Sequence, residues 1–109
     1  MGRLVYTLSV ALALTACAFA GSAGETAERA SGEELFKRHC AICHPAGGNI
    51  IKPAKTLHKK SREASNIKNA EEIVKQMRNP GPGMTPFDKN TLPDGDAGKI
   101  AEYILKTFN

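Results

Sequence analysis

Large aromatic side chains are scarce in this sequence. It contains no tryptophan, and aromatic residues make up 6% of its 109 residues. The part that we predict to fold, residues 31–109, has only Phe36, Phe87, Tyr103 and Phe108. A segment of this size with so few large side chains has a marginal core of its own, and such domains commonly need a cofactor or a covalent staple.

Long apolar runs are also absent. Residues 1–16 carry one charge, Arg3, and a short apolar run over residues 4–14 that two hydroxyl residues interrupt. A transmembrane helix needs about 20 apolar residues, so this run is too short to span a bilayer comfortably. A basic start, a short apolar stretch and small residues after it are typical of a secretory signal peptide. We therefore predict a signal peptide over residues 1–16 and export of the chain.

The signal peptide ends at Cys17 in the sequence Leu-Thr-Ala-Cys, which resembles the bacterial lipobox. In that motif the cysteine becomes the lipid-modified first residue of the mature protein. A free thiol is a liability in an oxidising compartment, and lipidation would use it. The resemblance implies a lipidated flexible tether over residues 17–30, and Ala18 is compatible with an outer-membrane lipoprotein that faces the periplasm. Cleavage after Ala20 is the alternative, and it would give a soluble periplasmic protein.

The other two cysteines lie in the pentapeptide Cys-Ala-Ile-Cys-His, residues 40–44. This spacing is the attachment signature of c-type haem. Residues three apart share one face of a helical turn, so Cys40 and Cys43 can both form thioethers with one porphyrin. His44 then falls under the iron as an axial ligand. We predict one covalently bound haem c, which would also supply the missing core.

Two other kinds of site contain a Cys-x-x-Cys pair. A thioredoxin-like motif lies in a βαβ pattern, and no strand-like alternation surrounds this pair. A structural zinc site needs four ligands. Outside the pentapeptide the remaining candidates are His39, His58 and the distant Cys17, so the sequence favours haem over zinc.

Helices are predicted at both ends of the folded part. Ser31 and Glu34 form a capping-box pattern that begins the first helix, which should extend to about Cys40. Near the other end, Asp94 or Asp96 is the expected cap of a longer helix. Its apolar residues recur with helical spacing, at Ala97, Ile100, Ala101, Ile104, Leu105 and Phe108.

These features resemble the class I cytochromes c, in which the terminal helices cross at a glycine and an aromatic residue. The residues that carry the resemblance are Gly32, Phe36, Cys40, Cys43 and His44 at one end and Ile100 and Tyr103 at the other. Gly-Gly-Asn at 47–49 and Lys-Thr-Leu at 55–57 are similar to the small c6 type carriers of algae and cyanobacteria. With its lipobox, the chain resembles the c6-like monohaem outer-membrane lipoprotein cytochromes of metal-reducing bacteria. The resemblance implies an all-α class I cytochrome c fold with three to four short helices around one haem.

A short middle helix, capped by Asn69, is expected before the stretch Pro-Gly-Pro-Gly-Met-Thr-Pro-Phe at residues 80–87. Prolines fix φ and glycines permit turns, so this stretch is predicted to be a stiff loop that presents Met84. By loop context and resemblance, Met84 is the expected second axial ligand of the iron. The family order is methionine, proline, any residue, phenylalanine, whereas here Thr85 precedes Pro86.

Three other residues are rival ligands. Met77 lies at helical spacing with Ile73 and Val74, which is more typical of a core residue. His39 is adjacent to the first cysteine and is expected to turn away from the sixth position. His58 lies in a basic stretch where a solvated side chain is expected. Either histidine would give a bis-histidine haem.

The charge of the chain excludes a strongly basic nucleic-acid binder. The formal net charge is +4, loss of Arg3 with the signal peptide leaves +3, and two haem propionates would lower it toward +1. The basic residues between positions 52 and 68 would form either a solvated face or a docking patch for an acidic redox partner or anionic lipid headgroups. They are Lys52, Lys55, Lys59, Lys60, Arg62 and Lys68.

The sequence predicts a one-electron carrier and not an enzyme. Low-spin iron held by His44 and Met84 would change charge without changing ligands. The expected partners are other redox proteins, multihaem cytochromes among them, and the membrane through the lipid anchor, and we expect a monomer. A haem enzyme, or a gas or redox sensor, is the alternative and needs a displaceable distal ligand with an acid or base nearby, for which Asp88 is the nearest candidate. A structural role in an envelope complex is a third hypothesis.

Overall fold

The computed structural model describes residues 30–109, within which the chain forms four α-helices and no strand. The helices are α1 (Gly32–His39), α2 (Lys59–Ala64), α3 (Ala70–Arg78) and α4 (Asp94–Thr107), and a short 3-10 helix, η1 (Pro45–Gly47), follows α1. The prediction of an all-α fold is confirmed. The predicted signal peptide, Cys17 and all but the last residue of the tether lie outside the described residues. None of the helices described here is long and apolar enough to cross a bilayer.

Side-chain caps begin α1 and α3, as predicted. The backbone N–H of Glu34 donates to Ser31 Oγ (3.2 Å), and the backbone N–H of Ser31 donates to Glu34 Oε2 (2.8 Å). At α3 the backbone N–H of Glu72 donates to Asn69 Oδ1 (2.9 Å). Each bond satisfies an amide near a helix start that has no partner within the helix.

The predicted cap of the last helix is wrong. The cap position of α4 is occupied by Pro93, which makes no side-chain capping bond, and Asp94 is the first helical residue. The Asp94 carboxylate is engaged elsewhere, by Arg78 Nη2 at 2.7 Å and Lys89 Nζ at 3.1 Å. Hydrogen bonds from these two cations hold the pKa of Asp94 below its ordinary value. Its negative charge still complements the positive end of the α4 dipole.

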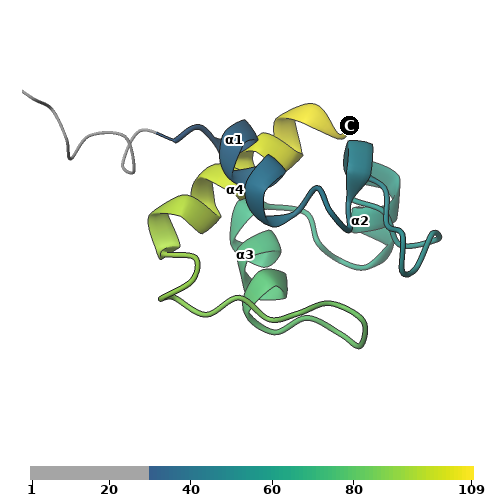
Figure 1. The fold of residues 1–109 in the computed structure, drawn as a ribbon. Coiled ribbons are helices and arrows are strands. Elements are labelled where there is room, and N and C mark those ends of the chain that lie inside the picture. Colours follow the sequence, from purple (N-terminus) through teal and green to yellow (C-terminus); the bar gives the residue numbers. More distant parts are fainter. Residues whose placement is uncertain (1–29) are drawn as a thin grey trace, which may run out of the picture.

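The helices α1 and α4 cross at Gly32 (Figure 1). A Cβ atom on Gly32 would overlap the carbonyl oxygen of Lys99 and lie 2.9 Å from Tyr103 Cβ. One turn later, the Phe36 ring lies 5.3 Å from the Tyr103 ring and 5.4 Å from the Phe108 ring. The expected close approach of another element to Gly32 is thus confirmed.

Replacing Gly32 by alanine is expected to lower the free energy of unfolding by about 1–3 kcal/mol, because the backbone of α4 has to move away from the added methyl group. Chemical denaturation measures this loss. The matched control is Gly98→Ala in α4, where a Cβ would meet nothing within 4 Å. The control should stabilise the protein by about 0.5–1 kcal/mol, since alanine favours a helix over glycine. Equal effects of the two substitutions would contradict a tight crossing.

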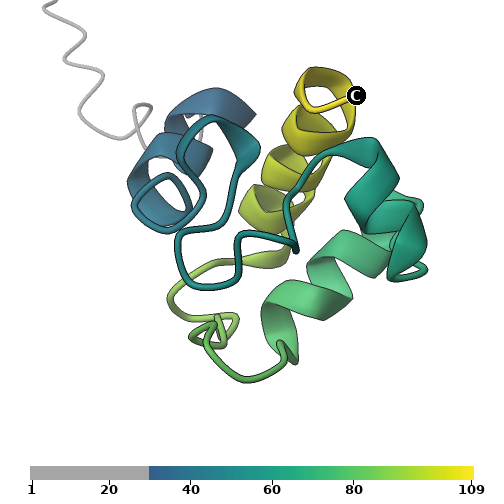
Figure 2. The ribbon, with the colours of Figure 1, turned by 90° about the vertical axis from the view of Figure 1, so that its right-hand side faces the viewer.

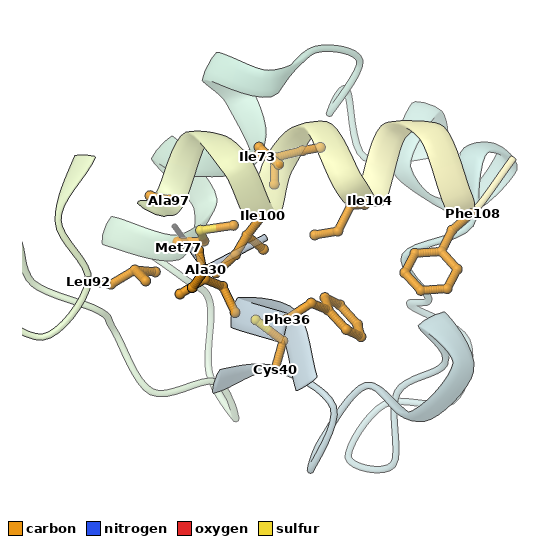
Figure 3. Close-up of a cluster of buried hydrophobic side chains, with 12 residues drawn as sticks. Ala30, Phe36, Cys40, Ile73, Met77, Leu92, Ala97, Ile100, Ile104 and Phe108 are labelled. Carbon is orange, nitrogen blue, oxygen red and sulfur yellow. The ribbon is translucent and has the colours of Figure 1, made fainter. Parts of the chain in front are cut away.

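The core lies where α1 and α3 pack against α4 (Figure 3). Leu35, Leu92 and Ile100 are its largest fully buried side chains, and Met77 contributes from α3. The cluster contains only small and medium-sized residues besides Phe36 and Phe108. That this side-chain core is marginal without a cofactor stays a prediction.

Candidate functional site

A cavity of about 500 Å³ adjoins this core. Its wall is formed by the end of α1 and the turn after it, the segment leading to α2, parts of α2 and α3, and the loop before α4. Figure 2 shows α1 and the turn after it on one side of α4, and α2 and α3 on the other. A concave site of this volume is typical of cofactor pockets.

The turn after α1 brings Cys40, Cys43 and His44 to the cavity wall. The backbone N–H groups of Cys43 (3.1 Å) and His44 (2.9 Å) both donate to the Cys40 carbonyl, so the chain continues α1 by one tight turn. Cys40 is buried, and burial raises the pKa of its thiol to about 11. No cluster of three metal-binding side chains occurs among residues 30–109.

The orientation of the His44 ring is set by the backbone. Its Nδ1 lies 2.7 Å from the Gly48 carbonyl oxygen. A carbonyl oxygen only accepts, so Nδ1 carries the proton and the Nε2 lone pair is free to bind a metal. Gly47 has φ +77°, and the space of its missing Cβ is filled by the Phe108 ring. The turn that supplies the Gly48 carbonyl is therefore packed directly against the end of α4.

Met84 reaches the cavity from the loop between α3 and α4. It is half-buried, and Gly83 before it has φ +96°, a conformation that glycine adopts without strain. The backbone N–H of Phe87 donates to the Met77 carbonyl (2.9 Å), which fastens the loop to the end of α3.

Comparison with known proteins shows what this arrangement is. The model of the family described as cytochrome C oxidase, cbb3-type, subunit III matches residues 27–104. Cytochrome c6 of Cyanidium caldarium is 42% identical over 74 residues, covering 68% of this chain and 66% of that protein. Cytochrome c6 of Leptolyngbya boryana is 39% identical over 79 residues, covering 72% of this chain and 92% of that protein. The structure of the outer membrane cytochrome OmcF of Geobacter sulfurreducens is similar with a TM-score of 0.71 and 47% identity, covering 72% of this chain and 100% of that one.

The chain belongs to the c6-like class I cytochromes. Proteins of this family carry one covalently attached haem c, transfer electrons to redox partner proteins and are not enzymes. The family resemblance predicted from the sequence is confirmed.

The rival ligands occupy three different positions in this cytochrome. Met77 is 3% exposed and belongs to the core cluster, as predicted, although it also contributes to the cavity wall. His58 is exposed and absent from the wall, with its ring edge against Phe108 at 5.6 Å. His39 lies on the wall, half-buried, and contacts the Phe87 ring at 6.1 Å.

Arg62 is the residue of the cytochrome that sequence reasoning misplaced. We predicted it as part of an exposed basic stretch, but it is 5% exposed and lines the cavity. Its Nε donates to the Leu57 carbonyl (2.7 Å) and its Nη2 to the Phe108 carbonyl (3.5 Å). Among the described residues it pairs with no carboxylate, although a buried charge normally needs a counter-charge. The sequence gives no sign of this role, because Arg62 lies in a short helix among other polar residues.

The residues on the wall fit the haem of the family. They include two thiols, an imidazole with a free Nε2, a thioether and a buried guanidinium that lacks an anionic partner. The two propionates of a haem would supply that missing negative charge, and its ring would fill the apolar part of the cavity.

Proposed function

We propose that this cytochrome holds its haem through thioethers from Cys40 and Cys43, with His44 and Met84 as the axial ligands, and works as a one-electron carrier. The haem, when bound, takes up and gives off the electron. The chain contributes the rest: the Gly48 carbonyl holds the His44 ring in one orientation, and the apolar side chains of the wall would pack against the cofactor.

The observation that favours a carrier over an enzyme or sensor is the chemistry of the cavity wall. No carboxylate of the described residues lines the cavity. Asp88, the predicted acid or base, is exposed and absent from the wall. Its Oδ1 accepts hydrogen bonds from the backbone N–H groups of Thr91 (2.7 Å) and Asn90 (3.0 Å). The bond from Thr91 is the main cause that lowers the pKa of Asp88, so this group stays ionised and bound to its own turn.

We further propose that the partner is an acidic redox protein, such as a multihaem cytochrome with an acidic face. Ile42 and Ile51 on the cavity wall are 82% and 54% exposed, and Lys52 and Lys55 lie on the same wall and are exposed. Lys59 and Lys60, the first two residues of α2, are also exposed. Exposed apolar side chains next to several charges of the same sign are typical of a transient docking surface.

The experiment that tests the carrier function measures electron transfer from the reduced protein to an acidic redox protein at rising salt concentration. One electron per chain should be transferred, and the bimolecular rate should fall with salt, because screening weakens the attraction between the two surfaces. A neutral small-molecule oxidant is the control and should react at a salt-independent rate. Free binding of carbon monoxide by the reduced protein, with slow electron transfer, would favour a sensor or an enzyme instead.

We also propose that Cys17 is lipidated and anchors the cytochrome to the outer membrane, facing the periplasm, after removal of residues 1–16. The lipobox-like sequence before Cys17 supports this proposal. Residues 18–30 are small and polar and would separate the lipid from the folded part. Cleavage after Ala20 is the alternative and gives a soluble periplasmic protein.

Replacing Cys17 by serine is expected to move the protein from the membrane fraction to the soluble fraction, since a serine takes no lipid at this position. The visible spectrum should stay unchanged, because the haem-binding residues lie elsewhere. Fractionation of cells that express each form measures this. A mutant that partitions with the membrane like the wild type would contradict the anchor.

A further inference from the structure

The loop that carries Met84 has few hydrogen bonds of its own. Apart from those of the helix caps, three backbone hydrogen bonds involve the loop between α3 and α4. The Met84 N–H donates to the Gly81 carbonyl over a long distance (3.5 Å). The Phe87 N–H donates to the Met77 carbonyl (2.9 Å), and the Leu92 N–H donates to the Asp88 carbonyl (2.9 Å). The Asp88 carboxylate closes only the turn at residues 88–91, where it accepts hydrogen bonds from the backbone N–H groups of Asn90 and Thr91. The rest of the loop would be free to open locally unless other groups hold it.

Arg78, the last residue of α3, provides such a group. Its Nη1 donates to three carbonyl oxygens of the loop: Phe87 (3.1 Å), Asp88 (3.1 Å) and Leu92 (2.7 Å). Its Nη2 donates to Asp94 Oδ1 at 2.7 Å. The Arg78 side chain is 20% exposed, and its Nε is buried with no partner among the described residues. One planar group therefore joins the end of α3, the second half of the loop and the start of α4.

These bonds act directly on the segment next to Met84. Phe87, three residues later, is held on both sides of its backbone: its N–H by the Met77 carbonyl and its carbonyl by Arg78. The other end of the segment leaves α3 immediately after Arg78. Both ends of the chain around Met84 are thus fixed to the same turn of α3. A lysine cannot replace this arrangement, because its single ammonium lacks the fork that spans carbonyls and carboxylate together.

We propose that Arg78 is the positioning residue for the sixth ligand: it holds the Phe87–Leu92 half of the loop so that the Met84 thioether stays on the haem iron. This inference rests on the proposed role of Met84. It adds that the strength of the Met84 bond depends on a guanidinium that contacts the backbone of the loop and Asp94.

The test uses the haem-loaded protein with Arg78→Lys and Arg78→Gln, at temperatures well below unfolding. Two readouts report the ligand itself: the weak long-wavelength absorption of the ferric iron to sulfur bond, and carbon monoxide binding to the reduced protein. We expect a weaker band and an apparent carbon monoxide affinity raised by about tenfold or more, since a loop that opens more often exposes the sixth position. Asp94→Asn keeps Arg78 but weakens its bond to α4, so it should show a smaller change in the same direction.

The matched control is Ile100→Val, a buried core change in α4 away from the cavity wall. It should lower the melting temperature and leave band and carbon monoxide affinity unchanged. Arg78 variants that lose stability but keep both readouts at wild-type values would overturn the positioning role and leave the Met84 assignment intact. A wild type without the sulfur band would overturn the Met84 assignment and this inference with it.

Discussion

Replacing Cys40 and Cys43 together by alanine is expected to abolish covalent haem and leave the chain largely unfolded. Without the haem, the cavity of about 500 Å³ would fill with water, and the apolar side chains on its wall would lose burial worth about 25 cal/mol per Å² of apolar surface. A domain with a total stability of about 5–15 kcal/mol does not tolerate a large loss of this kind. Intact mass measures the haem, and the far-ultraviolet circular dichroism melt measures the fold.

The matched control for the double substitution is Ile42→Ala. Ile42 lies between the two cysteines and is 82% exposed, so the control should keep both the haem and a cooperative melt. A haem-free double mutant that still melts cooperatively from a helical state would show that the side-chain core is sufficient without the haem.

Replacing Met84 by alanine is expected to open the sixth position of the iron. The reduced protein should then bind carbon monoxide readily, and the long-wavelength sulfur absorption should disappear. Met84→His should instead lower the reduction potential, because a neutral thioether favours ferrous iron more than an imidazole does. Optical titration with carbon monoxide and potentiometry measure these effects.

Met77→Ala is the matched control for the sixth ligand, since it removes the other thioether on the cavity wall. Met77 is 3% exposed, so its loss should lower the free energy of unfolding by about 2–5 kcal/mol and keep the sulfur absorption. The reverse outcome, with the absorption lost in Met77→Ala and kept in Met84→Ala, would show that the ligand assignment is wrong.

The fold was predictable from the sequence wherever a local pattern has one physical solution. Ser31 with Glu34, and Asn69 before Glu72, are capping patterns that need no tertiary information, and both helices begin where predicted. The close contact at Gly32 was predictable because a glycine in the first turn of a helix is costly without one.

What the sequence did not predict depends on contacts between distant segments. The sequence predicts Asp94 as a helix cap because carboxylates are common at the N-cap position. Its carboxylate instead accepts a hydrogen bond from Arg78, sixteen residues earlier in the chain. The sequence predicts a solvated Arg62 because its neighbours along the chain are polar. Only the fold brings its guanidinium within hydrogen-bond distance of the Leu57 and Phe108 carbonyls. The hydrogen bonds from Arg78 to three backbone carbonyls could not be predicted from the sequence, because every residue has a backbone carbonyl and no residue type marks the acceptors.

The crossing of α1 with α4 also bears on how fast this protein folds. Gly32 and Lys99 lie near opposite ends of the described residues, so the chain between them has to close into one long loop before they meet. Loop closure costs entropy that increases with loop length. Proteins with such distant contacts fold more slowly than helical bundles of similar size, in which helices contact their neighbours along the chain. We therefore expect the closure of this loop, rather than the formation of the short helices, to limit the folding rate.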